Sequence, residues 1–233
     1  MNWMKKVAVA LVCLLPLGLQ AAKIDTLQVK SPSMNKSIEV VVVSPDVAAT
    51  KACPVIYLLH GYGGNACTWV GIKPDLPKIA DEKGIFFVCP DGKNTWYWDS
   101  PLNADVRYET FISNELVKYV DSHYKTVADR KGRAITGLSM GGHGAMWNGL
   151  RHSDVFSAAG STSGGVDIRP FPKNWEMSVQ IGEKAKYPEN WEKYTVINLV
   201  PTLRKDQIAL IFDCGDSDFF LEVNKNYHEA LLK

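Results

Sequence analysis

Runs of apolar residues alternate along this chain with segments whose apolar residues recur at helical spacing. Segments 55–59, 85–89 and 208–212 are continuous and apolar, which is typical of strands buried on both faces. Segments 76–83 and 106–123 place apolar residues three and four positions apart and predict helices. Because helices separate successive buried strands, we expect an α/β fold with a mostly parallel central sheet and helices on both faces.

Other segments extend this pattern. Leu27–Lys30 and Ser37–Ser44 flank a turn-prone Ser31-Pro32-Ser33 and predict an antiparallel strand pair at the N-terminal side. Further strands are expected at 133–136 and 156–161. The stretch from Asp167 to Val200 has weaker periodicity, so we expect it to run as an excursion over the end of the sheet where ligands bind.

The first residues resemble a secretory signal. Lys5 and Lys6 precede an apolar run from Val7 to Leu19, and small residues follow it. We therefore expect a signal peptide at 1–22, a single domain at 23–233, a secreted or periplasmic location and no stable membrane insertion after cleavage. An uncleaved anchor is the alternative, although thirteen residues are too few to span a bilayer.

Composition limits the classes of partner. The chain has 233 residues, 46% of them hydrophobic, and a formal net charge of +1 with the charges scattered, so nothing indicates a nucleic-acid partner. We expect a small-molecule or oligosaccharide ester as the partner, and the sequence does not determine the oligomeric state. Four cysteines outside the signal, Cys53, Cys67, Cys89 and Cys214, allow three full disulfide pairings. No motif has zinc spacing, so neither a metal nor a cofactor is expected.

The segment Gly137-Leu138-Ser139-Met140-Gly141 is the strongest chemical signal. It lies between a predicted strand and a helix that begins with small residues, which is the setting of a nucleophile elbow. A serine hydroxyl is a weak nucleophile, so the fold has to hold it on a sharp turn within reach of a base. An ordinary glycine-rich turn is the alternative.

Three other loops are expected to meet Ser139 at the carboxyl ends of the strands. The glycine-rich turn at 60–64 can aim backbone N–H groups at an oxyanion, together with the N–H of Met140. The acidic turn at 213–218 offers Asp216 and Asp218 as the acid that orients a histidine. The segment 94–99 is aromatic, and we expect His60, Trp96 and Trp98 to contact the substrate.

Four motifs, at 58–64, 90–92, 137–145 and 215–219, together resemble the esterase D branch of the α/β-hydrolases. This branch includes S-formylglutathione hydrolases, mycolyltransferases of the antigen 85 type, tributyrin esterases and feruloyl esterases. The resemblance implies that Ser139 is the nucleophile and Asp218 the acid. It also implies that the backbone N–H groups of Tyr62 and Met140 form the oxyanion hole.

The chain departs from that family in its general base. The family histidine follows one further strand beyond the acid, whereas fifteen residues follow Asp218 here and His228 is the one histidine among them. His228 lies in a helix-like segment, and His143 is expected to pack beneath the elbow. The resemblance therefore predicts that the domain lacks its last strand and helix, and that the base lies beyond Lys233.

These features predict a secreted serine carboxylesterase that forms an acyl-enzyme on Ser139, with feruloyl or acetyl esters of plant polysaccharide fragments as candidate substrates. Three alternatives remain open: a thioesterase resembling S-formylglutathione hydrolase, an acyltransferase, and a non-catalytic binding protein without a base.

Overall fold

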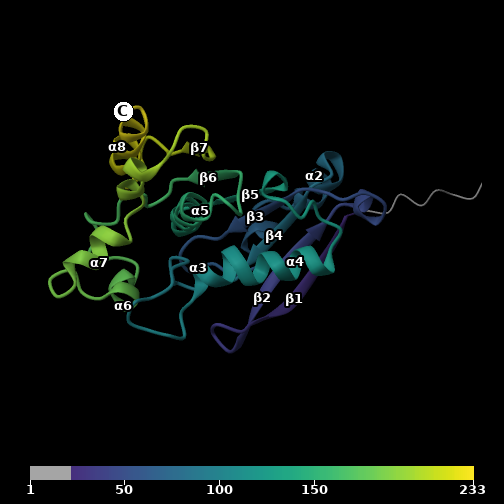
Figure 1. The fold of residues 1–233 in the computed structure, drawn as a ribbon, viewed down its shortest axis with the longest axis horizontal. Coiled ribbons are helices and arrows are strands. Elements are labelled where there is room, and N and C mark those ends of the chain that lie inside the picture. The colour runs from purple at the N-terminus through teal and green to yellow at the C-terminus, as the bar shows by residue number, and fades with distance from the viewer. Residues whose placement is uncertain (1–21) are drawn as a thin grey trace, which may run out of the picture.

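The computed structural model describes residues 22–233, which form a seven-stranded sheet (Figure 1). The strand order is β1-β2-β4-β3-β5-β6-β7. β1 pairs antiparallel with β2 and β2 with β4, whereas the pairs from β4 through β3, β5 and β6 to β7 are parallel. The prediction of a mostly parallel sheet with an antiparallel N-terminal pair is confirmed. The strands are β1 (Lys23–Ser31), β2 (Lys36–Ser44), β3 (Val55–Leu59), β4 (Phe86–Pro90), β5 (Arg133–Gly137), β6 (Ala158–Thr162) and β7 (Ala209–Asp213).

Along the chain, helices separate successive strands from β3 to β7, as the periodicity predicts, and α8 follows β7. The helix expected over 106–123 begins at Tyr108, and its middle, Phe111–Leu116, is π-helical. The excursion at 167–200 contains two short helices, and its last residues belong to a 3-10 helix, Val196–Thr202. The α-helices are α1 (Thr68–Ile72), α2 (Leu76–Lys83), α3 (Tyr108–Thr110), α4 (Val117–His123), α5 (Met140–Arg151), α6 (Met177–Ile181), α7 (Pro188–Lys193) and α8 (Leu221–Leu231).

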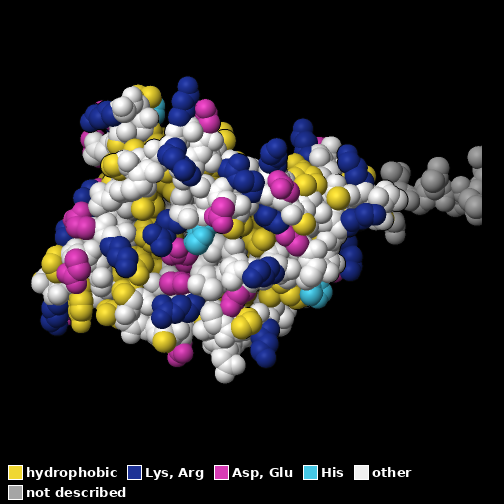
Figure 2. Space-filling model, viewed as in Figure 1, with side chains coloured by type: hydrophobic (Ala, Val, Ile, Leu, Met, Phe, Trp, Pro, Cys, Tyr) yellow, Lys and Arg dark blue, Asp and Glu magenta, His cyan; other side chains and the backbone are white. Residues whose placement is uncertain are grey.

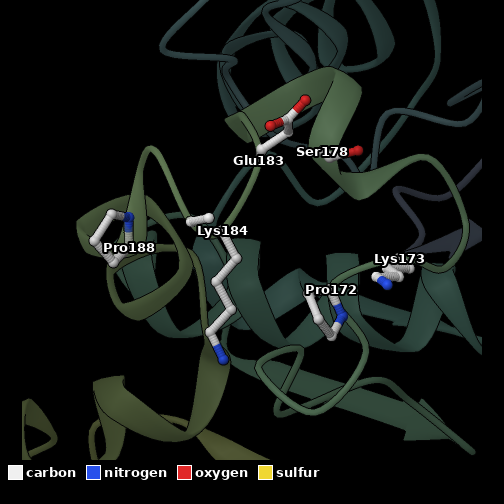
Figure 3. Close-up of a pocket in the computed structure, with 7 residues that line it drawn as sticks. Pro172, Lys173, Ser178, Glu183, Lys184 and Pro188 are labelled. Atoms are coloured by element: carbon white, nitrogen blue, oxygen red, sulfur yellow. The ribbon is translucent and has the colours of Figure 1, made fainter.

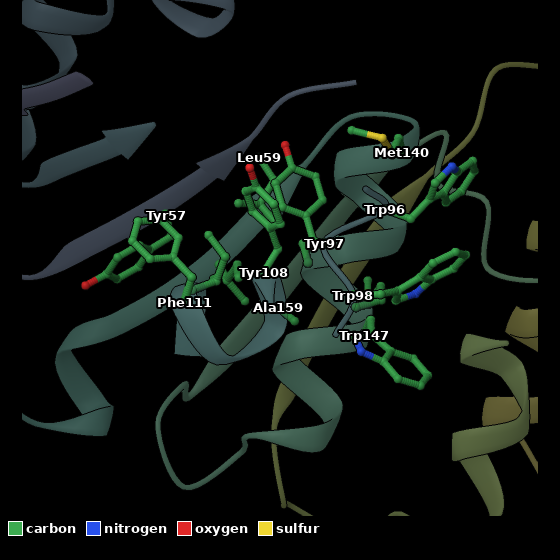
Figure 4. Packing of buried hydrophobic residues seen from close by; sticks show 14 of the residues in the cluster. Tyr57, Leu59, Trp96, Tyr97, Trp98, Tyr108, Phe111, Met140, Trp147 and Ala159 are labelled. Carbon is green, nitrogen blue, oxygen red and sulfur yellow. The ribbon is translucent and has the colours of Figure 1, made fainter. Parts of the chain in front are cut away.

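Two apolar clusters pack on opposite faces of the sheet. In β2, Val40 and Val42 belong to the larger cluster and Val41 and Val43 to the smaller one, because successive side chains of a strand point to opposite faces. Side chains of α3, α4, α5 and α8 build the larger cluster, part of which Figure 4 shows. α1 and α2 cover the other face. The expected helical layers on both faces are therefore present.

β7 forms one edge of the sheet, and its side chains are exposed or half-buried. β7 pairs with β6 alone among the described strands, and its Ile211 is 76% exposed. The expected further strand beyond β7 is not tested by residues 22–233 and stays a prediction. The expected signal peptide lies outside the described residues except for Ala22.

The surface carries interspersed charges of both signs on the face that Figure 2 shows. Within residues 22–233, no helix is both long enough and apolar enough to cross a membrane. Cys53, Cys67, Cys89 and Cys214 are all free thiols in this structure.

Helix α5 approaches the sheet closely because two glycines remove side chains at the contact. A Cβ added to Gly141 would lie 2.6 Å from the carbonyl oxygen of His60 and closer still to that of Leu59. A Cβ on Gly137 would meet the backbone of Gly141 in the same way. Both obstacles are backbone atoms, so a larger residue could be accepted only by moving α5 away from β3.

A buried carboxylate ties α3 to α5. Glu109, 7% exposed, accepts hydrogen bonds from Arg151 Nε at 2.8 Å and His152 Nε2 at 2.8 Å, and its second oxygen accepts one from Trp147 Nε1 at 2.7 Å. Burial alone would raise the pKa of Glu109, but these donors outweigh it and lower that pKa below its ordinary value. The network therefore stabilises the fold only while Glu109 is ionised.

We expect Gly141→Ala to lower the free energy of unfolding by about 1–3 kcal/mol, because the added methyl group overpacks a backbone contact. Urea unfolding followed by circular dichroism measures this change. Gly71→Ala is the matched control, since a Cβ at that helical position meets no atom within 4 Å. Equal stabilities of the two variants would contradict the close-approach explanation.

We expect Glu109→Gln to cost about 2 kcal/mol of unfolding free energy at pH 7, where the carboxylate is ionised. The pKa of Glu109 is lower in the folded than in the unfolded protein, so this stabilisation is present above the unfolded value and disappears as pH falls through the folded one. The difference between variant and wild type should therefore shrink below about pH 4. Glu192→Gln, which breaks an exposed pair with Arg169, should change stability by less than about 0.5 kcal/mol at either pH.

Candidate active site

Ser139 stands at the turn between β5 and α5 with a backbone conformation that side chains rarely adopt. Its φ is 54° and its ψ is −117°. Its N–H donates to the carbonyl oxygen of Thr162 at 2.9 Å, and the preceding N–H of Leu138 donates to Leu59 at 3.3 Å. The ends of β3 and β6 thus hold the serine from both sides. Strain of this kind persists only where the surroundings fix it, and it is typical of functional sites.

Two backbone N–H groups near Ser139 are candidates for the oxyanion hole. Met140 is the first residue of α5, so its N–H has no partner within the helix. Residues 61–64 form a β-turn closed by the Gly64 N–H on Gly61 at 3.0 Å, with Tyr62 and Gly63 at its centre. Gly63 has a φ of 76°, as the third position of a type II turn requires. The expected donors, Tyr62 and Met140, therefore lie on rigid backbone.

His60 orients this loop and is not available to a substrate. Its side chain is 1% exposed, Nδ1 lies 2.7 Å from the Gly61 carbonyl oxygen, and Nε2 accepts the Gly92 N–H at 2.9 Å. These partners place the ring proton on Nδ1 and occupy both nitrogens. The prediction that His60 contacts substrate is wrong, because its hydrogen bonds are used to join the loops after β3 and β4.

Trp96 and Trp98 are buried in the core and do not line a pocket mouth. They are 1% and 0% exposed, and their rings stack at 5.6 Å. Trp98 donates to His143 Nε2 at 2.8 Å, and Trp96 donates to the Trp175 carbonyl at 3.1 Å. The prediction that these two side chains contact substrate is therefore wrong. Buried indole N–H groups need acceptors, and the fold supplies them internally.

No histidine side chain is hydrogen-bonded to Ser139 within residues 22–233, although the backbone N–H of His143 donates to the Ser139 carbonyl oxygen at 3.0 Å. His143 is fully buried beneath the elbow, where its Nδ1 bonds the Gly165 carbonyl at 2.8 Å, and burial lowers its pKa to about 4. His152 bonds Glu109 and His123 bonds Tyr119, while His228 is exposed on α8. None of the five histidine side chains is therefore bonded to Ser139 in this structure, and the position of the general base stays a prediction.

Asp218 lies in the turn that follows β7. It is half-buried, and its Oδ1 accepts the Phe220 N–H at 2.7 Å. Asp213 is at the strand end, and Asp216 is exposed. No histidine bonds Asp218 in the part of the chain that the structure describes, so its role as the triad acid stays a prediction. One Asp218 oxygen already bonds the backbone, which fixes the direction of the carboxylate.

An aromatic surface that the sequence did not single out adjoins Asp218. Phe219 is 60% exposed and stacks on half-buried Trp175 with centroids 5.1 Å apart. Trp175 and Phe220 are in turn 5.2 Å apart. Trp175 comes from the excursion, forty residues before this turn, so no local pattern could have paired the two. Their stacking brings the excursion to the acidic turn.

A separate cavity of about 740 Å³ lies within the excursion, lined by side chains of the segments 172–178 and 183–188 (Figure 3). None of its lining residues belongs to the turns that carry Ser139, Tyr62 or Asp218. Across residues 22–233, no three His, Cys, Asp or Glu side chains gather closely enough to hold a metal ion.

Comparison with known proteins agrees with this geometry. The Esterase family model, described as "Putative esterase", matches residues 31–231. The chain is 28% identical over 149 residues to an esterase of Mycobacterium tuberculosis, covering 61% of this chain but 32% of that protein. It is 26% identical over 194 residues to an acetyl esterase of Caldicellulosiruptor saccharolyticus, covering 76% of this chain and 70% of the relative. The chain thus spans about a third of the length of the first relative.

Solved structures give the same result for the fold. A ferulic acid esterase superposes with a TM-score of 0.74 at 29% identity, covering 91% of this chain and 86% of that one. A fluorophosphonate-binding serine hydrolase of Staphylococcus aureus superposes with a TM-score of 0.79 at 20% identity over 91% and 87% of the two chains. The family match covers most of the sequence, and the strained serine lies where an α/β-hydrolase has its elbow. The chain therefore belongs to the Esterase family of α/β-hydrolases, which act on ester bonds.

Proposed function

We propose that this protein is an exported serine carboxylesterase that forms an acyl-enzyme on Ser139. The observation that carries the proposal is the backbone of Ser139, which is held at a φ of 54° between the ends of β3 and β6. Family membership supports an ester of small size as the substrate. Export rests on the signal-like sequence at 1–22.

The proposed chemistry is acyl transfer in two steps. Ser139 Oγ attacks the ester carbonyl carbon, and its proton passes to a general base. The N–H groups of Met140 and Tyr62 stabilise the negative oxygen of the tetrahedral intermediate. The intermediate then collapses, expelling the alcohol with the proton returned by the base, and water hydrolyses the acyl-enzyme by the same route.

The base is the part of the proposed mechanism for which no described histidine side chain is bonded to Ser139. In the proposed triad, a histidine receives the Ser139 proton on one nitrogen and donates from the other to Asp218. A histidine beyond Lys233, which the family resemblance predicts, stays a prediction. Assaying this chain beside a version extended by the following codons of the gene tests it, since equal and robust activity of both would contradict it.

We place the acyl or alcohol group of the substrate against Phe219 and Trp175. An exposed aromatic pair beside Asp218 suits a planar aryl ring or the face of a sugar. Similarity to a ferulic acid esterase and to an acetyl esterase supports feruloyl and acetyl esters of plant polysaccharide fragments as candidates. Phe219 and Trp175 take the place of Trp96 and Trp98 as the proposed substrate contacts, because Trp96 and Trp98 are buried.

A non-catalytic binding protein is the second candidate, because no histidine side chain within residues 22–233 is hydrogen-bonded to Ser139. Retained ester binding without covalent labelling of Ser139 would favour it. An acyltransferase would instead yield a transesterified product when an acceptor alcohol is added.

With imidazole added as the base, we expect a fluorophosphonate probe to label the wild type at Ser139 and not to label Ser139→Ala. The probe reports a prepared nucleophile, and intact-mass and peptide mass spectrometry locate the adduct. Ser163→Ala is a matched control, because Ser163 lies in the loop after β6 and is not the elbow residue. Labelling of the wild type at another serine would contradict the assignment of Ser139 as the nucleophile.

Added imidazole should raise the hydrolysis of p-nitrophenyl acetate by this chain about tenfold or more, because a free base can take the serine proton where no side chain does. Ser139→Ala should show no such increase beyond the rate of imidazole alone. If imidazole has no effect while the wild type turns over rapidly, a described residue acts as the base.

We expect Phe219→Ala to lower kcat/KM for ethyl ferulate about five- to tenfold and to change that for ethyl acetate less than twofold, because the ring loses a stacking partner. Ile24→Ala removes an exposed apolar side chain from β1, at the opposite edge of the sheet, and should alter neither value. Equal losses on both esters would indicate that Phe219 does not contact the aryl group.

A further inference from the structure

The turn that carries the Tyr62 N–H is tied to two other loops by a single side chain. Asn94, in the loop after β4, accepts the Gly63 N–H through Oδ1 at 2.9 Å. Its Nδ2 donates to Glu176 Oε2 at 3.2 Å. One amide thus joins the turn after β3 to Glu176 of the excursion, which lies 82 residues beyond Asn94.

Both ends of this bridge are held in unusual backbone conformations. Gly63 and Glu176 have φ values of 76° and 53°, and Trp175, the neighbour of Glu176, has 47°. The Trp175 carbonyl accepts the buried Trp96 N–H at 3.1 Å, which anchors the excursion to the core at this point. The backbone next to Glu176 is therefore anchored to the core by Trp96, and the Glu176 carboxylate accepts the hydrogen bond from Asn94.

Glu176 also acts on the exposed part of the same turn. Burial is the largest cause of the raised pKa of the Tyr62 hydroxyl, and the nearby Glu176 carboxylate raises that pKa further. Glu176 is therefore close to Tyr62, and it reaches Gly63 through Asn94.

We propose that Asn94 and Glu176 are positioning residues that hold the turn at 61–64 in the conformation that aims the Tyr62 N–H at the oxyanion. The proposal rests on the proposed esterase function. In a type II turn the Tyr62–Gly63 peptide can flip, since glycine accepts both orientations. Fixing the Gly63 N–H on Asn94 prevents this flip, and the turn then holds the adjoining Gly61–Tyr62 peptide, to which the Tyr62 N–H belongs, in place before the substrate binds.

Exchanging the donor and the acceptor between the two side chains tests whether their hydrogen bond matters. Asn94→Asp keeps an acceptor for Gly63 but sets a carboxylate against Glu176, and Glu176→Gln keeps an acceptor for Asn94. The double variant Asn94→Asp/Glu176→Gln reverses the donor and the acceptor and restores the bridge. Asn198→Ala is the matched control, because Asn198 donates to Glu192 in a comparable exposed pair of the excursion.

Two measurements on the full chain decide the outcome. The first is the rate of phosphonylation of Ser139 by a fluorophosphonate at a fixed imidazole concentration, separated into the saturation constant of the probe and the limiting rate. The second is hydrogen exchange of the backbone amides in a peptide that covers 61–64. We expect Asn94→Ala to lower the limiting rate about tenfold, with the saturation constant unchanged and faster exchange at 61–64.

Asn94→Asp should lower the limiting rate of phosphonylation by less than Asn94→Ala does. The limiting rates of the double variant, of Glu176→Gln and of the Asn198→Ala control should all lie within about twofold of the wild-type rate. A limiting rate and an exchange profile of Asn94→Ala equal to wild type would overturn the proposal, as would a double variant no better than Asn94→Asp. If the wild type is not labelled at all, the proposed esterase function fails, and the exchange data alone decide whether the bridge holds the turn.

Discussion

The backbone turn at Ser139 depends on how closely α5 can approach the ends of β3 and β5. Gly137 and Gly141 leave no side chain in that contact, so the helix begins directly against the carbonyl groups of Leu59 and His60. The same close approach lets β3 and β6 hold residues 138 and 139 by backbone hydrogen bonds. A strained conformation that would cost about 1–3 kcal/mol in isolation is thereby fixed by its surroundings.

The loops beyond the carboxyl ends of the strands are joined by buried polar side chains, which explains why several candidate residues serve structure. His60 bridges the loops after β3 and β4, and His143 bridges α5 to Gly165 and Trp98. Each ring has both nitrogens occupied, and an unpaired one would be costly in a dry core. Through these hydrogen bonds the two histidines hold the loops of the candidate site in place.

The excursion contributes more to the site than its weak periodicity indicates. Trp175 stacks on Phe219 beside Asp218, and Glu176 reaches the turn at 61–64 through Asn94. Two consecutive residues of one loop thus contact both the acid side and the oxyanion side of the candidate site. Substrate selection and donor placement would then depend on the same short segment.

The sequence by itself determined the order of strands and helices, the two-faced sheet and the elbow, because each rests on local periodicity or on a glycine-serine pattern. It misjudged His60, Trp96 and Trp98, since local sequence does not show whether an aromatic or imidazole ring faces solvent or core. It also gave no sign of the contacts from Trp175 to Phe219 and from Asn94 to Glu176, which join residues about forty and eighty positions apart. Only the tertiary structure decided these, because packing and hydrogen-bond satisfaction in the interior select partners irrespective of their separation along the chain.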